Sequence, residues 1–211
     1  MSHSDTLEQA AVIAWKGERL VVCAFAGSGK TTTLRRFAEE NPTERMLYIA
    51  YNRAIRDEAE HKFPFNVTCK TSHQLAWPTV GKHYSHRLIN ILRLTDVARA
   101  LNSRNWLLAR LTLDVLNRFM CSAATDITPE HMPDPDDCKG LQLGQILLSA
   151  KKIWAMMSAR QGDFPVTHDT YLKLYQLSKP NLSSRYTTLL FDEAQDANPV
   201  ISAIVLNQTC R

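Results

Sequence analysis

The segment AFAGSGKTTTL, residues 24–34, constrains the fold of this 211-residue chain more than any other stretch. It follows the short apolar run RLVVCAFA, residues 19–26, and opens a helical pattern. The sequence therefore predicts a buried parallel strand, a glycine turn and a helix. A turn of this kind points successive backbone N–H groups inward, and the helix amino terminus adds partial positive charge. We interpret the segment as a phosphate-binding loop; a glycine turn that binds nothing is the less favoured alternative.

Two side chains of this loop have the chemistry that a nucleotide site requires. The ammonium group of Lys30 is placed for the β- and γ-phosphates, and the Thr31 hydroxyl is placed to bind Mg²⁺. The usual pattern of such loops opens with glycine, whereas this sequence has Ala24 at that position.

A second signal, this one acidic, lies near the end of the chain. There the apolar run at residues 189–191 leads into Asp192 and Glu193. An aspartate at the carboxyl end of a buried strand can hold the water shell of Mg²⁺, and an adjacent glutamate can deprotonate an attacking water molecule. An exposed strand end is the alternative for this run considered alone. The presence of a phosphate-binding loop in the same chain makes the metal-binding interpretation the favoured one.

The remaining pattern predicts an α/β fold with a parallel sheet and helices on both faces. Strand and helix signals alternate up to residue 77 and return from residue 185, whereas residues 78–184 carry mainly helical periodicity. We therefore expect an ATP-binding domain formed by residues 1–77 with 185–211, and a helical insertion at residues 78–184.

Composition is consistent with a globular protein. The net charge is +4, which permits nucleic-acid binding without requiring it. The five cysteines form no CxxC pair, and neither a signal peptide nor a membrane span is evident. The sequence predicts a soluble protein of the cytoplasm, or of the nucleus if the source is eukaryotic, with no membrane partner.

Together, AFAGSGKTTTL and FDEAQD resemble motifs I and II of superfamily 1 DNA helicases of the UvrD/Rep type, in which alanine commonly opens the loop. Three further blocks match in order: TLEQAAVI, AYNRAIRDEAE and CKTSHQLA. The likeness is strongest to the helicase domain of the F-box DNA helicase family, particularly in THDTYLKLYQLSKP. The resemblance implies a RecA-like P-loop NTPase that uses ATP and Mg²⁺.

The resemblance also implies roles for individual residues at the nucleotide. Gln9 would read the adenine edge, Thr31 and Asp192 would serve Mg²⁺, and Glu193 would be the catalytic base. Gln195 would couple the nucleotide site to DNA. The residues around the phosphates would be Ala26, Gly27, Ser28, Gly29, Lys30, Thr31 and Thr32.

On the DNA side, the resemblance implies contacts to a single strand from motifs Ia and Ib. The residues concerned are Tyr51, Asn52, Thr71 and His73, and Arg53 is a reasonable extra phosphate contact. An aromatic ring can stack on a base, and the polar groups can bond phosphates. Packing beside the sheet is the alternative for Tyr51 and His73.

Family members continue past motif II into a further strand and a second motor domain, so the resemblance implies a truncated motor without its arginine fingers. We expect the chain alone to bind Mg-nucleotide weakly, to hydrolyse it slowly if at all, and not to unwind DNA. Its partners would be single-stranded DNA and either the absent motor domain or an intact helicase. No F-box is seen ahead of Gln9, so no F-box partner is expected.

Two other classes of function are alternatives to a helicase. A small P-loop kinase would need an arginine-rich lid and a GTPase would need an NKxD-type base reader, and neither pattern is present in the sequence. A non-catalytic module that binds nucleotide, DNA or a helicase remains the alternative to an enzyme.

Overall fold

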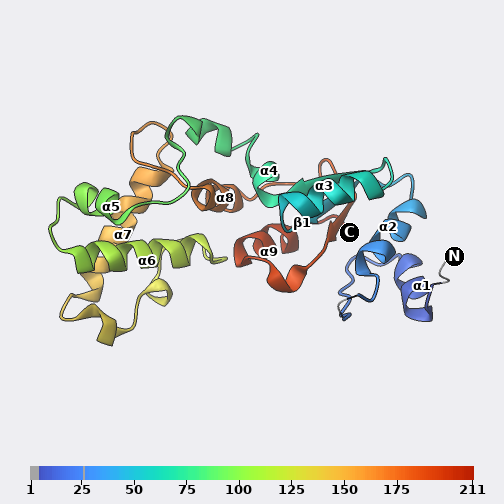
Figure 1. Ribbon diagram of the computed structural model, residues 1–211, viewed down its shortest axis with the longest axis horizontal. Coiled ribbons are helices and arrows are strands. Elements are labelled where there is room, and N and C mark those ends of the chain that lie inside the picture. The colour runs from blue at the N-terminus through green and yellow to red at the C-terminus, as the bar shows by residue number, and fades with distance from the viewer. Residues whose placement is uncertain (1–4, 26) are drawn as a thin grey trace. The chain divides into compact units, whose positions relative to one another are not determined.

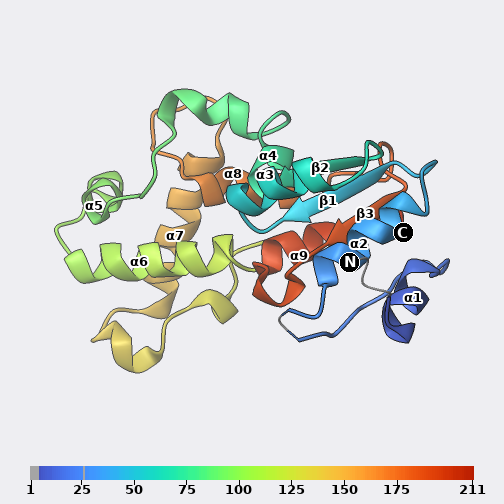
Figure 2. The ribbon, with the colours of Figure 1, turned by 45° about the vertical axis from the view of Figure 1, so that its right-hand side comes forward.

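Three parallel strands organise the α/β fold in the computed structural model, which describes residues 5–25 and 27–211 (Figure 1). Within those residues the sheet has the order β2–β1–β3, and Figure 2 shows β1 between its two neighbours. The strands are β1 (Met46–Ala50), β2 (Val67–Thr71) and β3 (Thr188–Phe191). The predicted α/β class and the parallel sheet are confirmed.

Burial on both faces explains why β1 is the central strand. All five of its residues are buried, as expected for an apolar run between two parallel neighbours. Met46, Tyr48 and Ala50 point into one core, which also includes side chains from α2 (Lys30–Glu39) and α3 (Arg53–Lys62). The helix at the phosphate-loop segment is therefore packed against the same strand that lies beside β3.

Helices make up most of residues 78–184, as the helical periodicity of that segment predicts. The other α-helices are α1 (Leu7–Ile13), α4 (Ser72–Ala76), α5 (Leu94–Leu101), α6 (Trp106–Met120), α7 (Leu143–Ser158), α8 (His168–Leu177) and α9 (Pro199–Leu206). The 3₁₀ helices are η1 (Gly81–Arg87), η2 (Pro129–His131), η3 (Pro135–Cys138) and η4 (Ala194–Asp196). No helix among the described residues is long and apolar enough to cross a lipid bilayer.

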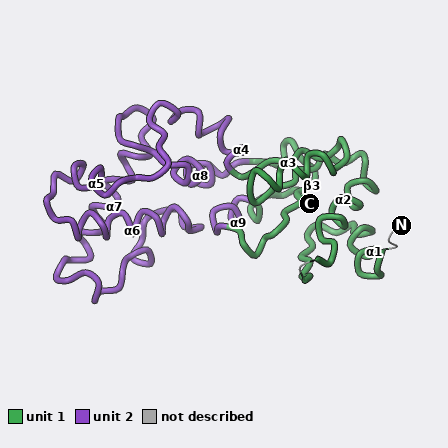
Figure 3. The backbone as a smooth tube through the Cα atoms, viewed as in Figure 1, with its two compact units in different colours: residues 1–72, 181–197, 205–211 green, residues 73–180, 198–204 purple. Residues whose placement is uncertain are grey.

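The chain divides into two compact units, which Figure 3 colours separately. Unit 1 takes in the described residues up to Ser72 together with residues 181–197 and 205–211, and it holds the sheet. Unit 2 comprises residues 73–180 and 198–204 and is helical. Residues 198–204, which include the first part of α9, group with unit 2 although they follow β3 in the sequence.

The predicted strand at residues 19–26 is wrong for its described part. Residues 19–25 form neither strand nor helix, and Val21 and Phe25 are 86% and 91% exposed. At the outer edge of β3, the backbone of Arg211 instead donates to the Thr187 carbonyl and accepts from the N–H of Leu189. An apolar run becomes a buried strand only when a neighbouring strand pairs with it. Among the described residues, no strand pairs with this run.

The core of unit 2 is formed largely by α5, α6 and α7. Beside it lies Lys173 of α8, whose side chain is fully buried. Its Nζ atom donates to the carbonyls of Ser122 (2.8 Å) and Ala124 (2.5 Å), just beyond the end of α6, and lies 4.3 Å from the Phe119 ring centroid. Burial lowers the pKa of Lys173 to about 8. The buried amine thus supplies hydrogen bonds to carbonyl groups of the loop that follows α6.

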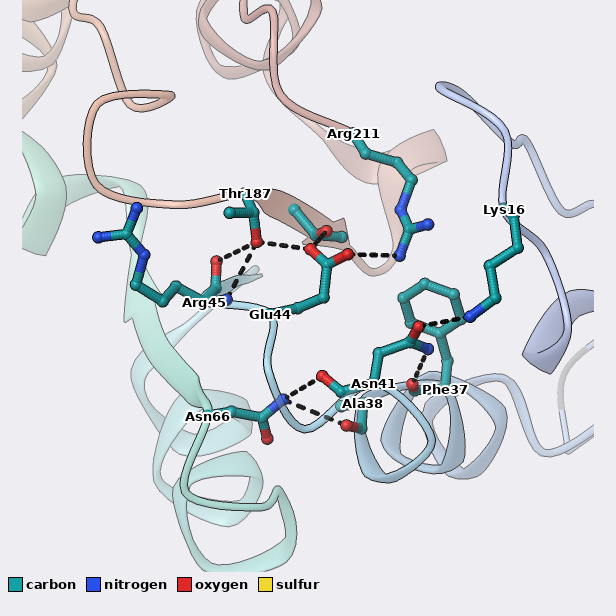
Figure 4. Close-up of polar contacts among 10 residues, drawn as sticks. Lys16, Phe37, Ala38, Asn41, Glu44, Arg45, Asn66, Thr187 and Arg211 are labelled. Carbon is teal, nitrogen blue, oxygen red and sulfur yellow. Dashed lines mark hydrogen bonds and ion pairs between the residues drawn. The ribbon is translucent and has the colours of Figure 1, made fainter.

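In unit 1, Glu44 joins the start of β1 to the start of β3 (Figure 4). Its carboxylate accepts from the hydroxyls of Thr187 (2.5 Å) and Thr188 (2.8 Å) and pairs with Arg211 at 3.3 Å. Partial burial acts to raise the pKa of Glu44. The two hydroxyls and the charges of Arg211 and Lys16 together hold it below its ordinary value of 4.5.

The lowered pKa of Glu44 predicts a pH-dependent contribution to stability. The ionised carboxylate stabilises unit 1 fully above pH 4.5, and this contribution is lost as the pH falls through the lower folded-state pKa. Glu44→Gln should therefore lower the unfolding free energy near neutral pH, and the difference from the unaltered chain should shrink below pH 4.5. Denaturant melts across pH 3–7 measure this, with the exposed Glu18→Gln as control. A difference that stays constant with pH would contradict the assignment.

Replacement of the buried amine should weaken unit 2. Lys173→Met leaves the carbonyls of Ser122 and Ala124 without these donors, while it also removes the burial cost of the charge. Because two acceptors lose a bond, we expect a net loss of about 1–3 kcal/mol of unfolding free energy. Lys152→Met, an exposed position on α7, is the matched control for denaturant unfolding. An equal or higher stability of Lys173→Met would show that the burial cost dominates.

Candidate nucleotide site

Two glycines give the phosphate-loop segment its shape. Gly27 and Gly29 have φ angles of +78° and +83°, in the left-handed region that side chains with a Cβ atom rarely adopt. Gly29 is also the residue that caps the amino terminus of α2. The turn therefore ends directly at Lys30, the first residue of the ten-residue helix α2. The first backbone N–H groups of this helix point toward the loop.

The carboxylate of Asp192 joins this loop to the sheet. The Thr31 hydroxyl donates to its Oδ2 atom at 2.8 Å, across 161 residues of sequence. The Tyr48 hydroxyl of β1 donates to the same oxygen at 3.0 Å, and the Glu193 N–H donates to Oδ1 at 3.0 Å. Asp192 is only 7% exposed. The structure thus brings together Thr31 and Asp192, the two residues predicted to serve a metal ion.

Lys30 and the residues after Asp192 also lie at this end of the sheet. The Lys30 Nζ atom is 3.5 Å from the carbonyl of Phe25, so the side chain folds back along its own loop. Glu193 has a φ of +51°, which is an uncommon conformation for a residue with a side chain. The amide of Gln195 donates to the Glu193 carboxylate at 2.5 Å. The predicted base and its neighbour are therefore held together on a strained turn.

Gln9 contacts the loop directly. Its side-chain oxygen accepts from the N–H of Thr6, forming a capping box at the start of α1, and its Nε2 atom donates to the Ser28 carbonyl at 3.0 Å. In this arrangement the side-chain amide is engaged on both sides. To read an adenine edge, as the resemblance implies, Gln9 would have to release the Ser28 carbonyl.

The donor set is suited to Mg²⁺ and a nucleotide phosphate. Mg²⁺ usually takes one or two carboxylates and completes its shell with water and substrate phosphates. The described residues hold no group of three or more His, Cys, Asp or Glu side chains that could bind a metal without such help. A Cβ atom added at Gly27 would meet nothing within 4 Å, so the loop has open space beside it. Ala26 lies outside the described residues, and Thr32 is exposed at the start of α2.

The residues of unit 1 that are predicted to contact DNA all lie at or next to the ends of helices and strands. Tyr51 follows β1 and is 60% exposed, so it is not a packed core residue. Asn52 caps α3, because its side chain accepts from the Ile55 N–H at 2.9 Å. Arg53 is exposed, whereas Thr71 is buried at the end of β2. Tyr51 and Arg53 therefore have the exposure that a nucleic-acid contact needs.

His73 belongs to unit 2 and packs in an aromatic cluster there. Its ring centroid lies 5.9 Å from that of His168 and 5.6 Å from that of Tyr171, and Trp77 contacts Tyr171 in turn. Burial lowers the pKa of His73, although the charge of Asp169 acts to raise it. The ring is therefore neutral at pH 7 and would offer phosphate a hydrogen bond rather than a charge.

Tyr48 is a residue of this site that the sequence alone does not reveal. It stands in the middle of an apolar strand, where the pattern predicts only a buried run. A buried tyrosine usually finds a partner for its hydroxyl. That rule could have predicted a polar neighbour for Tyr48, but not that the neighbour is Asp192.

Sequence comparisons identify relatives of this chain, although no family model matches it. The chain is 36% identical over 219 residues to F-box DNA helicase 1 of Gallus gallus, and 33% identical over 214 residues to F-box DNA helicase protein 1 of Schizosaccharomyces pombe. These alignments take in 92% and 91% of this chain but only 21% and 24% of the two relatives. Over nine-tenths of its length, the chain is thus a homologue of F-box DNA helicases and corresponds to one part of those longer proteins.

Proposed function

We propose that this chain is the ATP-binding part of an ATP-dependent DNA helicase of the UvrD/Rep type, coupling ATP hydrolysis to 3′–5′ movement on single-stranded DNA. Unit 1 would be the RecA-like motor domain and unit 2 its helical insertion. The chain on its own would bind Mg-nucleotide with little turnover. Its homology to F-box DNA helicases supports this assignment.

The hydrogen bond between Thr31 and Asp192 is the observation that carries the proposal. It joins the first turn of the helix after the glycine loop to the acidic end of β3. A phosphate-binding loop and a metal-binding carboxylate must meet in this way if they are to share one Mg-nucleotide. The two segments are 161 residues apart in the sequence, so a chance contact between unrelated motifs is a poor explanation.

Each residue of the site has a distinct proposed role. The α2 amino terminus and Lys30 bind the phosphates, and Thr31 and Asp192 hold Mg²⁺ or its water shell. The bound ion would neutralise charge that develops on the phosphates. Glu193 would orient and deprotonate the attacking water, and its contact with Gln195 would link it to the DNA-bound state. Because Glu193 is already fixed by its turn, little reordering would be needed for that role.

A non-catalytic module derived from a helicase is the second candidate. The exposed apolar run at residues 19–25 favours it, because a loop that follows an unpaired segment is less rigidly held than one that follows a strand. Under this alternative the chain would bind nucleotide or DNA without multiple turnover. Turnover measured with DNA and a supplied second motor domain separates the two candidates, because the first candidate requires such turnover and the second predicts none.

Lys30→Ala should weaken nucleotide binding by about 10- to 100-fold, because it removes a charged donor to the phosphates. Fluorescence titration with a labelled ATP in the presence of Mg²⁺ measures the affinity. Lys62→Ala, which removes an exposed lysine of α3 in the same unit, is the matched control. Equal affinity of the Lys30→Ala chain and the unaltered chain would contradict the proposed nucleotide site.

Tyr51→Ala should weaken binding of an oligothymidylate by about 5- to 100-fold, since base stacking on an aromatic ring contributes about 1–3 kcal/mol. Fluorescence anisotropy with a labelled oligonucleotide measures the change. Phe65→Ala is the control, because Phe65 is another exposed aromatic side chain of unit 1. The same loss in both variants would mean that Tyr51 has no specific place on the DNA path.

A further inference from the structure

We propose that Tyr48 is a positioning residue for the metal-binding carboxylate of Asp192, and that it leaves Oδ1 as the oxygen available to Mg²⁺ or its water shell. The inference rests on the proposed nucleotide-binding function. It assigns a role to a side chain of the central strand, whose hydroxyl donates to Asp192.

Strand register places Tyr48 within reach of Asp192. Tyr48 pairs with Leu190 across the β1–β3 ladder, and Leu190 precedes Asp192 by two residues. Side chains two residues apart on a strand point to the same face. The ring of Tyr48 packs against Phe63, with the ring centroids 4.8 Å apart. The Tyr48 hydroxyl lies at the carboxyl end of β3, beside Asp192. The 3.0 Å bond to Asp192 Oδ2 is therefore a product of the register.

The number of hydrogen bonds that each carboxylate oxygen can accept explains why Oδ1 stays available. Each carboxylate oxygen has two lone-pair directions. Oδ2 accepts from Thr31 at 2.8 Å and from Tyr48 at 3.0 Å, so both of its directions are occupied. Among the described residues, Oδ1 accepts one hydrogen bond, from the Glu193 N–H at 3.0 Å. One direction on Oδ1 thus remains for a cation or a bound water molecule.

Tyr48 is suited to hold this geometry while a ligand binds. Its side chain is fully buried. Its hydroxyl donates to Asp192 Oδ2 from the central strand, whose five residues are all buried. The Thr31 hydroxyl is the other donor to Oδ2, but it is exposed and must also serve the metal ion in the proposed site. Tyr48 is the donor whose position does not depend on the ligand.

Tyr48→Phe tests the role, since it keeps the ring and removes only the hydroxyl. Binding of a labelled ATP is measured as Mg²⁺ is titrated, and again in EDTA. The Mg²⁺ concentration at half-saturation should rise about tenfold, because a hydrogen bond to a charged group is lost. The affinity for the metal-free nucleotide should stay unchanged. Phe63→Leu is the control, because it loosens packing on the same ring without touching the hydroxyl.

The possible outcomes distinguish the proposed function from the role of Tyr48. An unaltered chain that binds no nucleotide at any Mg²⁺ concentration contradicts the proposed function and the role of Tyr48 together. A chain that binds Mg-nucleotide normally, with the same Mg²⁺ dependence in Tyr48→Phe, overturns the role of Tyr48 alone. A shift of equal size in Phe63→Leu also overturns it, since packing would then be the cause.

A second measurement applies if Tyr48→Phe fails to fold. In the unaltered chain, the buried Tyr48 hydroxyl proton should exchange slowly with water and give a resolved NMR signal. Addition of Mg-ATP should shift this signal, whereas ATP in EDTA should shift it much less. A signal that does not respond to Mg-ATP would overturn the proposed role.

Discussion

A single buried carboxylate joins the parts of unit 1. Asp192 lies at the carboxyl end of β3, where a charged group out of water requires hydrogen-bond donors to offset its desolvation. The donors come from three places: the start of α2, the middle of β1 and the backbone beyond β3. The sheet register and the first turn of the helix must therefore both be correct before the carboxylate is satisfied. Fold and candidate site depend on the same contacts.

The local sequence pattern is sufficient to predict most strands and helices of unit 1. The apolar runs of β1 and β3 are short, continuous and bounded by polar residues, so their strand character could be predicted without knowledge of their neighbours. The glycine loop is equally local, because Gly27 and Gly29 are needed where φ is positive. The contact between Thr31 and Asp192 followed from the combination of these signals with the resemblance to helicases.

Features that depend on distant neighbours were not predictable in the same way. Residues 19–25 have the composition of a strand, yet pairing is decided by what lies beside β3, and there the backbone of Arg211 bonds to it. The link from Tyr48 to Asp192 depends on the register between two strands that are far apart in the sequence. The bond from Gln9 to Ser28 likewise arises from the position of α1 beside α2.

The left-handed backbone at Glu193 has a consequence for experiments on this residue. Glycine and asparagine adopt such angles more readily than other residues, so they would relax the turn while they remove the acid. Glutamine or alanine would remove the acid and keep the backbone strain. A comparison between the two pairs, rather than any single variant, would separate the contribution of main-chain geometry from that of the negative charge.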